Sequence, residues 1–142
     1  MLTIASKNRE IDCTYGGFAR LREIASKIAG GEFYEIYHFP FEHYSELIDP
    51  KTSETANLVY SRKIEAVERK YSSDIAGIIN FLTACDAGGK LTESQCLKLT
   101  DLFRNATEEQ LNISINSYQP TLVRDFVEML CDGAEEGGIE WY

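Results

Sequence analysis

The feature that most constrains the fold is a change in the spacing of apolar residues between the chain ends and the middle. "LTIAS" and "IDCTY" near the N-terminus alternate apolar and polar residues, and "IEWY" at the other end has the length of one short strand. The middle repeats at helical spacing. We therefore expect a predominantly helical α+β fold with a small antiparallel sheet, in which Leu2–Ala5 pairs with Ile11–Tyr15 and Ile139–Tyr142 adds a third strand.

The length of 142 residues fits a single domain spanning 1–142. A chain of this size buries roughly two-thirds of the surface that it exposes when unfolded. With 44% hydrophobic and 26% charged residues, the composition is that of an ordinary globular protein.

Apolar stripes at helical spacing predict helices from residue 16 to the Gly30-Gly31 pair, over 52–71 and over 72–85. In the first, Arg22 is expected on the charged, solvent-facing side; in the second, Leu58 is expected in the buried stripe. Later helices are expected to begin at two capping boxes, to use Pro120 in a first turn, and to include Ile115. The two boxes are Thr92 with Gln95 and Thr107 with Gln110.

The segment 33–44 is unusually rich in aromatic residues, and Pro40 lies within it. Because proline removes a backbone donor and restricts the residue before it, we expect two short turns around a bend rather than one helix. Tyrosine buries a large area at little entropic cost, which suits binding surfaces. We expect Phe33, Phe39 and Phe41 to be buried, and we take as candidate contact residues Tyr34, Tyr37 and Tyr44.

The net charge of −9 is unevenly distributed along the chain. Residues 1–72 carry 10 Lys and Arg against 11 Asp and Glu, whereas residues 73–142 carry 4 against 12. Such a field disfavours nucleic acid and anionic membranes and favours a basic protein partner. The candidate partner-binding acids follow the last basic residue, Arg124: Asp125, Glu128, Asp132, Glu135 and Glu136.

The loop "DAGGKL" after the third helix resembles a calcium loop only in outline. With Gly89 and Leu91 at the positions where an EF-hand needs glycine and an apolar residue, Asp86 is the only carboxylate among the side-chain ligand positions. We therefore expect Gly88 and Gly89 to form a bend that Asp86 caps, and no calcium site.

Two histidines and four cysteines are the remaining candidates for chemistry. His38 and His43, with Glu42 between them, can contribute to a zinc site or to a Cys–His nucleophile pair, but neither arrangement has the flanking residues that such chemistry requires. We expect no catalytic residue, no metal and no cofactor. The cysteines, none in a C-x-x-C pair, are expected to be buried thiols, although Cys85 and Cys96 flank one loop and can approach each other.

Two short motifs in the chain are similar to motifs of a known group of proteins. Tyr15, Gly17 and Phe18 form a Tyr-x-Gly-Phe start to the first helix. A second motif runs from Phe81 and Leu82 through Asp86, Gly89 and Leu91 to Cys96. In these motifs the chain resembles a group of small bacterial proteins to which no activity is attached, so the resemblance supports the fold and implies no function. Relatives often carry a second acid where this chain has Gly88.

These observations together predict a non-enzymatic, acidic protein-binding domain, such as a bacterial immunity or inhibitor protein that neutralises a basic partner. A phage-encoded inhibitor of a host nucleic-acid enzyme, or a small enzyme that uses His38 or His43, are the alternatives. "MLTIASKNRE" does not have the pattern of a signal peptide, so the expected compartment is the cytoplasm.

Overall fold

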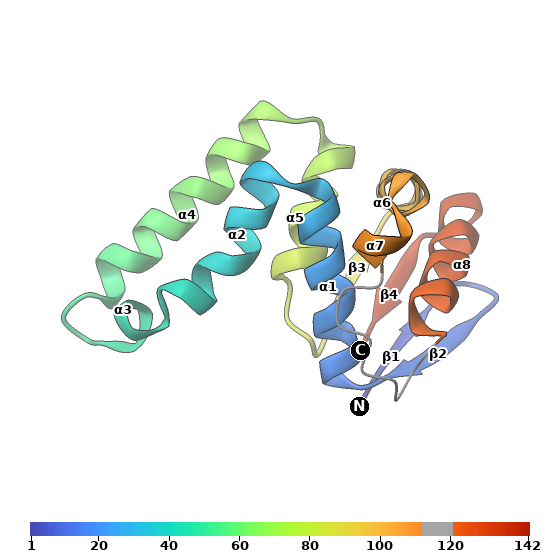
Figure 1. The fold of residues 1–142 in the computed structure, drawn as a ribbon, viewed down its shortest axis with the longest axis horizontal. Coiled ribbons are helices and arrows are strands. Elements are labelled where there is room, and N and C mark those ends of the chain that lie inside the picture. The colour runs from blue at the N-terminus through green and yellow to red at the C-terminus, as the bar shows by residue number, and fades with distance from the viewer. Residues whose placement is uncertain (112–120) are drawn as a thin grey trace.

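The computed structural model describes residues 1–111 and 121–142 and places eight helices and four strands in them. The elements form one fold around one hydrophobic core (Figure 1). In chain order they are β1 (Leu2–Ala5), β2 (Glu10–Cys13), α1 (Tyr15–Ala29), α2 (Gly31–Glu42), α3 (Tyr44–Ile48), α4 (Ser53–Lys70), α5 (Ser73–Thr83), β3 (Gly89–Leu91), α6 (Glu93–Asn105), α7 (Glu108–Leu111), α8 (Leu122–Glu135) and β4 (Ile139–Trp141).

The sheet is antiparallel and has the order β2-β1-β4-β3. Ile4 lies opposite Ile11 on one side and opposite Trp141 on the other, so β4 joins the N-terminal hairpin. This confirms the expected fold class and the expected partner of the last strand. The fourth strand, β3, is an addition: its three residues pair with β4 from Gly89 opposite Trp141 to Leu91 opposite Ile139.

The hairpin differs from the prediction at its second strand. Pairing begins at Glu10 and ends at Cys13, so Tyr15 belongs to α1 and not to the strand. Thr14 has extended backbone angles, and its hydroxyl oxygen accepts a hydrogen bond from the Gly17 amide at 2.9 Å. An N-cap of this kind satisfies a free amide of the first turn and therefore fixes where the helix starts.

The core is organised around the indole of Trp141, which comes from β4. Its centre lies 5.7 Å from the Phe18 ring on α1 and 5.8 Å from the Phe81 ring on α5. Phe126 on α8 stacks on Phe81 at 5.4 Å, and Phe103 on α6 meets Phe126 edge-on at 5.7 Å. The five rings therefore connect the sheet to four helices, and each ring is at most 2% exposed.

Both predicted capping boxes are present. The Thr92 hydroxyl accepts from the Gln95 amide, and the Gln95 side chain accepts from the Thr92 amide at 2.9 Å, at the start of α6. Thr107 and Gln110 form the same reciprocal pair at α7. The predictions for Ile115 and Pro120 lie outside the described residues.

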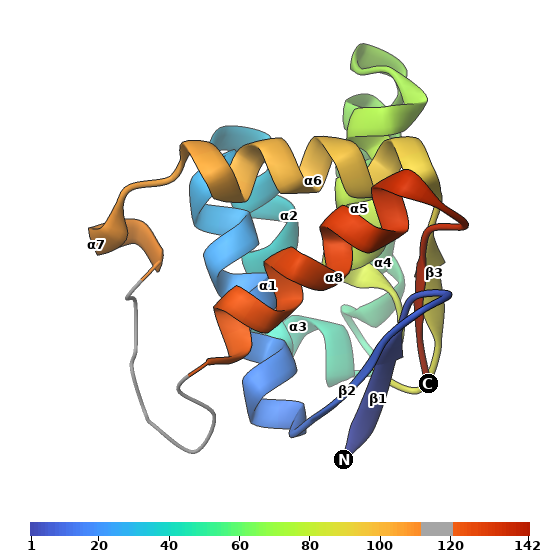
Figure 2. The same cartoon turned by 90° about the vertical axis from the view of Figure 1, so that its right-hand side faces the viewer.

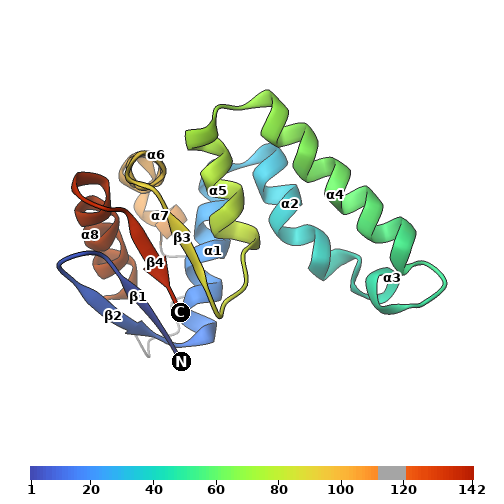
Figure 3. The same cartoon turned by 180° about the vertical axis from the view of Figure 1, so that it is seen from behind.

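Helices α2, α3 and α4 form an arm, residues 31–70, that projects away from the sheet and from α8, with α3 at its far end (Figures 1 and 3). Stacked rings of Phe39 and Tyr60, 5.0 Å apart and nearly parallel, join α2 to α4. At the base of the arm, Glu32 accepts hydrogen bonds from Lys70 and from the Tyr71 hydroxyl, both at 3.1 Å.

The prediction that Pro40 divides the aromatic segment was wrong, because α2 continues through Pro40 to Glu42. Proline costs a helix interior about 3 kcal/mol. Burial of one large apolar side chain returns roughly 1.5–3 kcal/mol, and Phe33, Ile36 and Phe39 are all buried on this helix. The free energy gained by packing along the helix therefore exceeds the free-energy cost of one missing hydrogen bond in its last turn.

Two predictions of burial on the arm were also wrong. Phe41 is 65% exposed and Leu58 is 49% exposed. On α4, only Val67 is buried, while Tyr60 and Ile64 are partly buried against the core. The stripe of α4 that meets the rest of the protein therefore runs through Tyr60, Ile64 and Val67 and leaves Leu58 outside.

The rest of the body packs α6 and α8 side by side near the sheet (Figure 2). In the described part of the chain, no helix is both long enough and apolar enough to cross a lipid bilayer.

Candidate functional site

The predicted acidic surface lies on α8 and the turn after it, where basic residues of the β1–β2 hairpin neutralise part of it. Arg9 contacts Glu128 at 2.7 Å and Asp132 at 3.0 Å, and Lys7 pairs with Glu136. These acids raise the pKa of Arg9, chiefly through the hydrogen bond to Glu128. Three of the five predicted acids therefore pair with basic residues of the hairpin.

The two remaining acids of that set differ from each other. Asp125 accepts a hydrogen bond from the Thr121 hydroxyl at 2.8 Å and lies 3.7 Å from Arg124. Glu135 is exposed. As a docking surface, α8 therefore offers less free negative charge than its sequence indicates, although the chain as a whole keeps its net charge of −9.

The three candidate tyrosines are not equivalent. Tyr37 is 7% exposed, and its hydroxyl donates to the Ala19 carbonyl oxygen, so it belongs to the core and cannot serve a surface. Tyr34 is 38% exposed and stacks on His38, with ring centres 3.9 Å apart. Tyr44 is 63% exposed at the start of α3. The acids of α8 lie on the opposite side of the body, so the two predicted sets do not form one site (Figure 1).

The far end of the arm, residues 41–49, is named the tip, and it exposes large apolar side chains. Phe41, Tyr44 and Ile48 are each at least 60% exposed. The tip contains three acids and neither lysine nor arginine, and all three acids are exposed. They are Glu42, Glu46 and Asp49. Exposed aromatic and aliphatic groups with polar and charged groups around them are typical of a protein-binding surface.

A cavity of about 360 Å³, the tip cavity, lies between the end of α2, α3 and the first turns of α4. Phe39, Ala56 and Val59 form its apolar part, and the charged and polar groups in its lining include His43, Glu46 and Lys51. The sequence pointed to the aromatic segment, but it did not indicate that Ala56 and Val59, from a separate helix, would face it.

Each histidine is held by a carboxylate. The Nε2 atom of His38 lies 2.7 Å from Glu23, and its Nδ1 atom lies 2.8 Å from the carbonyl oxygen of Tyr34, so both nitrogens are engaged. The Nδ1 atom of His43 lies 2.6 Å from Glu46. A histidine oriented by a carboxylate is one part of a catalytic dyad. In the described residues, the structure shows no hydroxyl or thiol hydrogen-bonded to either imidazole.

The other side chains that can bind a metal ion do not lie close together in the described residues. The described residues contain no group of three or more His, Cys, Asp or Glu side chains placed to hold a metal ion. All four thiols are free. Cys13 and Cys96 are buried as expected, and burial raises the pKa of each to about 11; Cys85, expected to be buried, is exposed, and Cys131 is half-buried.

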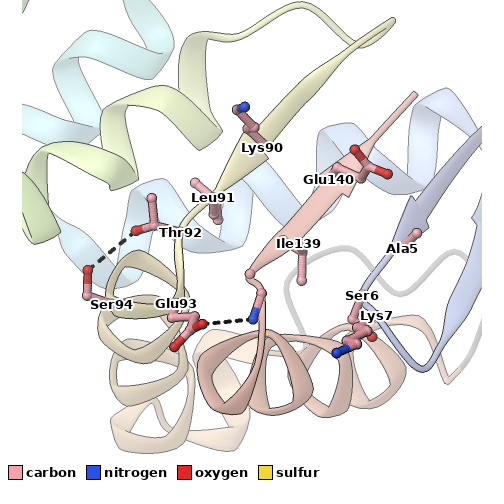
Figure 4. Close-up of a pocket in the computed structure, with 12 residues that line it drawn as sticks. Ala5, Ser6, Lys7, Lys90, Leu91, Thr92, Glu93, Ser94, Ile139 and Glu140 are labelled. Atoms are coloured by element: carbon pink, nitrogen blue, oxygen red, sulfur yellow. Dashed lines mark hydrogen bonds between the residues drawn. The ribbon is translucent and has the colours of Figure 1, made fainter.

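A second cavity, of about 900 Å³, lies where β3 and β4 meet the start of α6 (Figure 4). Lys7, Lys90, Glu93 and Glu140 contribute both signs of charge to its lining. The Glu93 carboxylate already accepts a hydrogen bond from the Gly137 amide at 3.0 Å. No histidine or cysteine is among the described residues that line this cavity. Its hydroxyls come from Ser6, Thr92 and Ser94, and among the described residues none of them is hydrogen-bonded to a group that would act as its general base.

The loop after α5, which resembles a calcium loop in outline, carries an ion pair with Arg22. The guanidinium of Arg22 contacts Asp86 at 2.6 Å and donates to the carbonyl oxygens of Phe81, at 2.8 Å, and of Ala84. It lies 4.4 Å from the centre of the Phe18 ring. Arg22 is 8% exposed, so its predicted place on the solvent face was wrong. Asp86 therefore balances a buried cation from α1.

Most residues of the two resemblance motifs have packing roles, whereas Tyr15 is exposed and Asp86 pairs with Arg22. Phe18, Phe81, Leu82, Leu91 and Cys96 are all buried. Gly89 lies against the Trp141 indole, where an added Cβ would be 2.2 Å from Cζ2. No protein-family model matches the chain, and searches of curated proteins and of solved structures find no match.

Proposed function

We propose that this chain is a non-enzymatic protein-binding domain that binds a basic protein, as an immunity or inhibitor protein does. The observation that carries the proposal is the tip, where Phe41, Tyr44 and Ile48 are exposed among acids that no lysine or arginine of the tip balances. Apolar anchors supply affinity at such a surface, and surrounding charge selects a partner of opposite sign.

The acids of α8 have a different role in this proposal. Because Lys7 and Arg9 neutralise several of them locally, they add to the long-range field more than to a contact surface. A net charge of −9 accelerates the encounter with a basic partner, and salt weakens that effect. The free thiols are compatible with a reducing compartment, and we propose the cytoplasm.

The experiment compares three immobilised baits in a lysate of the source organism. They are the wild type, a tip variant with Tyr44→Ala and Ile48→Asp, and a control with Leu97→Asp, a substitution at an exposed leucine of α6. A basic protein that the wild type and the control retain, that the tip variant loses and that salt releases supports the proposal. Equal retention by the tip variant contradicts it.

The same surface suits a phage-encoded inhibitor of a host nucleic-acid enzyme, because such enzymes are basic where they bind phosphates. Genome neighbourhood distinguishes the two origins. A toxin gene beside this gene supports immunity, whereas a cluster of phage genes supports inhibition of a host enzyme.

An enzyme is the second candidate function, and one observation favours it. His43 is oriented by Glu46 and faces the tip cavity, which can receive a small apolar group. Metal analysis of the purified protein tests the zinc form of this candidate: stoichiometric zinc that is lost in His43→Ala favours the enzyme over the binding domain.

A further inference from the structure

Helix α4 is long, but it buries little of its surface against the rest of the chain. It has 18 residues, and only Val67 among them is buried. In Figures 1 and 3 it forms an outer side of the arm, with no other element drawn beyond it. A helix that is polar around most of its circumference needs support from side-chain pairs or from a partner.

One line of exposed residues runs along α4 on the side away from the core, and we name it the outer stripe. Its members are separated by four, four, three and four positions, so they lie on one face of the helix. All five are exposed. They are Glu54, Leu58, Arg62, Glu65 and Arg69.

The two unpaired charges of the outer stripe lie symmetrically around its one apolar member, Leu58. Glu54 lies four positions before Leu58, and Arg62 lies four positions after it. Glu65 and Arg69 pair with each other at 3.7 Å, whereas neither Glu54 nor Arg62 has an ion-pair partner within the described residues. Because an unpaired acid and an unpaired base lie at equal distances from Leu58, the segment from Glu54 to Arg62 is complementary to the same segment in the reverse direction.

We propose that α4 binds α4 of a second copy of this chain in antiparallel orientation, with Leu58 at the two-fold axis. In that arrangement Glu54 of each copy faces Arg62 of the other, and the two leucines contact each other. A two-fold interface uses the same patch twice, so a self-complementary charge pattern is what it requires. The paired segment covers about 12 Å of helix, which predicts a weak, salt-sensitive dimer.

This arrangement goes beyond the proposed function. The two tips point away from each other, so the dimer presents two separate binding surfaces. A partner that offers two sites is then bound with higher avidity than either tip alone provides.

Sedimentation velocity and light scattering over a range of protein concentrations test the dimer without any partner. We expect a reversible dimer that dissociates at high salt. Glu54→Arg alone and Arg62→Glu alone place like charges opposite each other and should weaken the dimer at least about tenfold. The double variant, Glu54→Arg with Arg62→Glu, restores opposite pairs and should restore the dimer.

Two leucine variants test whether the dimer forms through the outer stripe or through another exposed surface. Leu58→Asp should abolish the dimer, whereas Leu97→Asp, at a leucine that is 51% exposed compared with 49% for Leu58, should leave it intact. A wild type that stays monomeric at millimolar concentration overturns the proposal. A dimer that survives Leu58→Asp, that depends equally on Leu97, or that the double charge variant fails to restore also overturns it. None of these results depends on the tip, so failure here leaves the proposed function standing.

Discussion

The Nη1 atom of Arg22 lies 2.6 Å from the Oδ1 atom of Asp86, and this contact fixes the end of α5 against α1. Burial lowers the pKa of the guanidinium, and the nearby carboxylate opposes that effect. The cation also satisfies two carbonyl oxygens at the end of α5 that the helix leaves free. The Arg22 side chain therefore satisfies the carbonyl oxygens at the end of α5, as a helix cap would, and also neutralises the carboxylate of the following loop.

We expect Arg22→Ala to lower the free energy of unfolding by about 2–4 kcal/mol, because it leaves two carbonyl groups unsatisfied and removes the packing of the guanidinium on Phe18. Urea unfolding followed by circular dichroism measures the change. Lys98→Ala, at an exposed site on α6, should stay within about 0.5 kcal/mol of the wild type. A similar small loss for Arg22→Ala would show that the buried network contributes little.

Adjacent glycines in the β3 loop give a matched pair of tests. A Cβ at Gly89 would lie 2.2 Å from the Trp141 ring, whereas at Gly88 the nearest atom is 3.9 Å away. Gly89→Ala should therefore destabilise the fold by about 1–3 kcal/mol and change the emission of the single tryptophan. Gly88→Ala should change neither, and equal effects at the two positions would contradict the packing of β3 on the indole.

Stability should fall at alkaline pH because of two buried thiols. Burial raises the pKa of Cys13 and of Cys96 to about 11, from an ordinary value of 9.0. The neutral thiol is favoured in the folded state, so its contribution is complete below about pH 9 and is lost as pH rises toward about 11, by about 2 kcal/mol for each thiol. Burial raises the pKa of Tyr37 and Tyr60 in the same direction.

Single variants isolate the thiol contribution from that of the tyrosines. Cys13→Ala and Cys96→Ala should each flatten the decline in unfolding free energy between pH 8 and about pH 11, whatever their effect at pH 7. Chemical denaturation across that pH range provides the measurement. Unchanged slopes in both variants would mean that these thiols do not titrate with unfolding.

The arm should open more readily than the body. The Phe39–Tyr60 stack is one of few buried contacts that hold α4 to α2. Hydrogen exchange should therefore be faster in α3 and α4 than in α1, α6 and α8, and Phe39→Ala should accelerate it in the arm alone. Mass spectrometry of peptic fragments resolves these segments. Uniform acceleration over all helices would show that the arm and the body unfold as one unit.

Local signals in the sequence predicted much of the fold. The Thr92–Gln95 capping box involves only neighbouring residues. The structure confirms that α6 starts there and that both hydrogen bonds of the box are formed. Alternation of apolar residues predicted the hairpin, a burial pattern of period two. Its pairing with the last strand was predicted because two strands alone are marginally stable and need a third.

The features that the sequence did not reveal depend on distant partners. Arg22 sits beside the apolar stripe of α1, and only the carbonyl groups of residues 81 and 84 explain its burial. The three residues of β3 become a strand because β4 lies beside them. Likewise, the acids of α8 formed a uniform run in the sequence, but Lys7 and Arg9 come to them from the opposite end of the chain.

The pairing of β1 with β4 determines how the protein responds to force. Thr3 and Tyr142 exchange two backbone hydrogen bonds, so the antiparallel strands have their outer ends at the same side of the sheet. Tension applied between these two residues loads the bonds one after another, as in opening a zipper, and does not shear them together. The core that Trp141 organises should therefore open at low force when it is pulled from these positions.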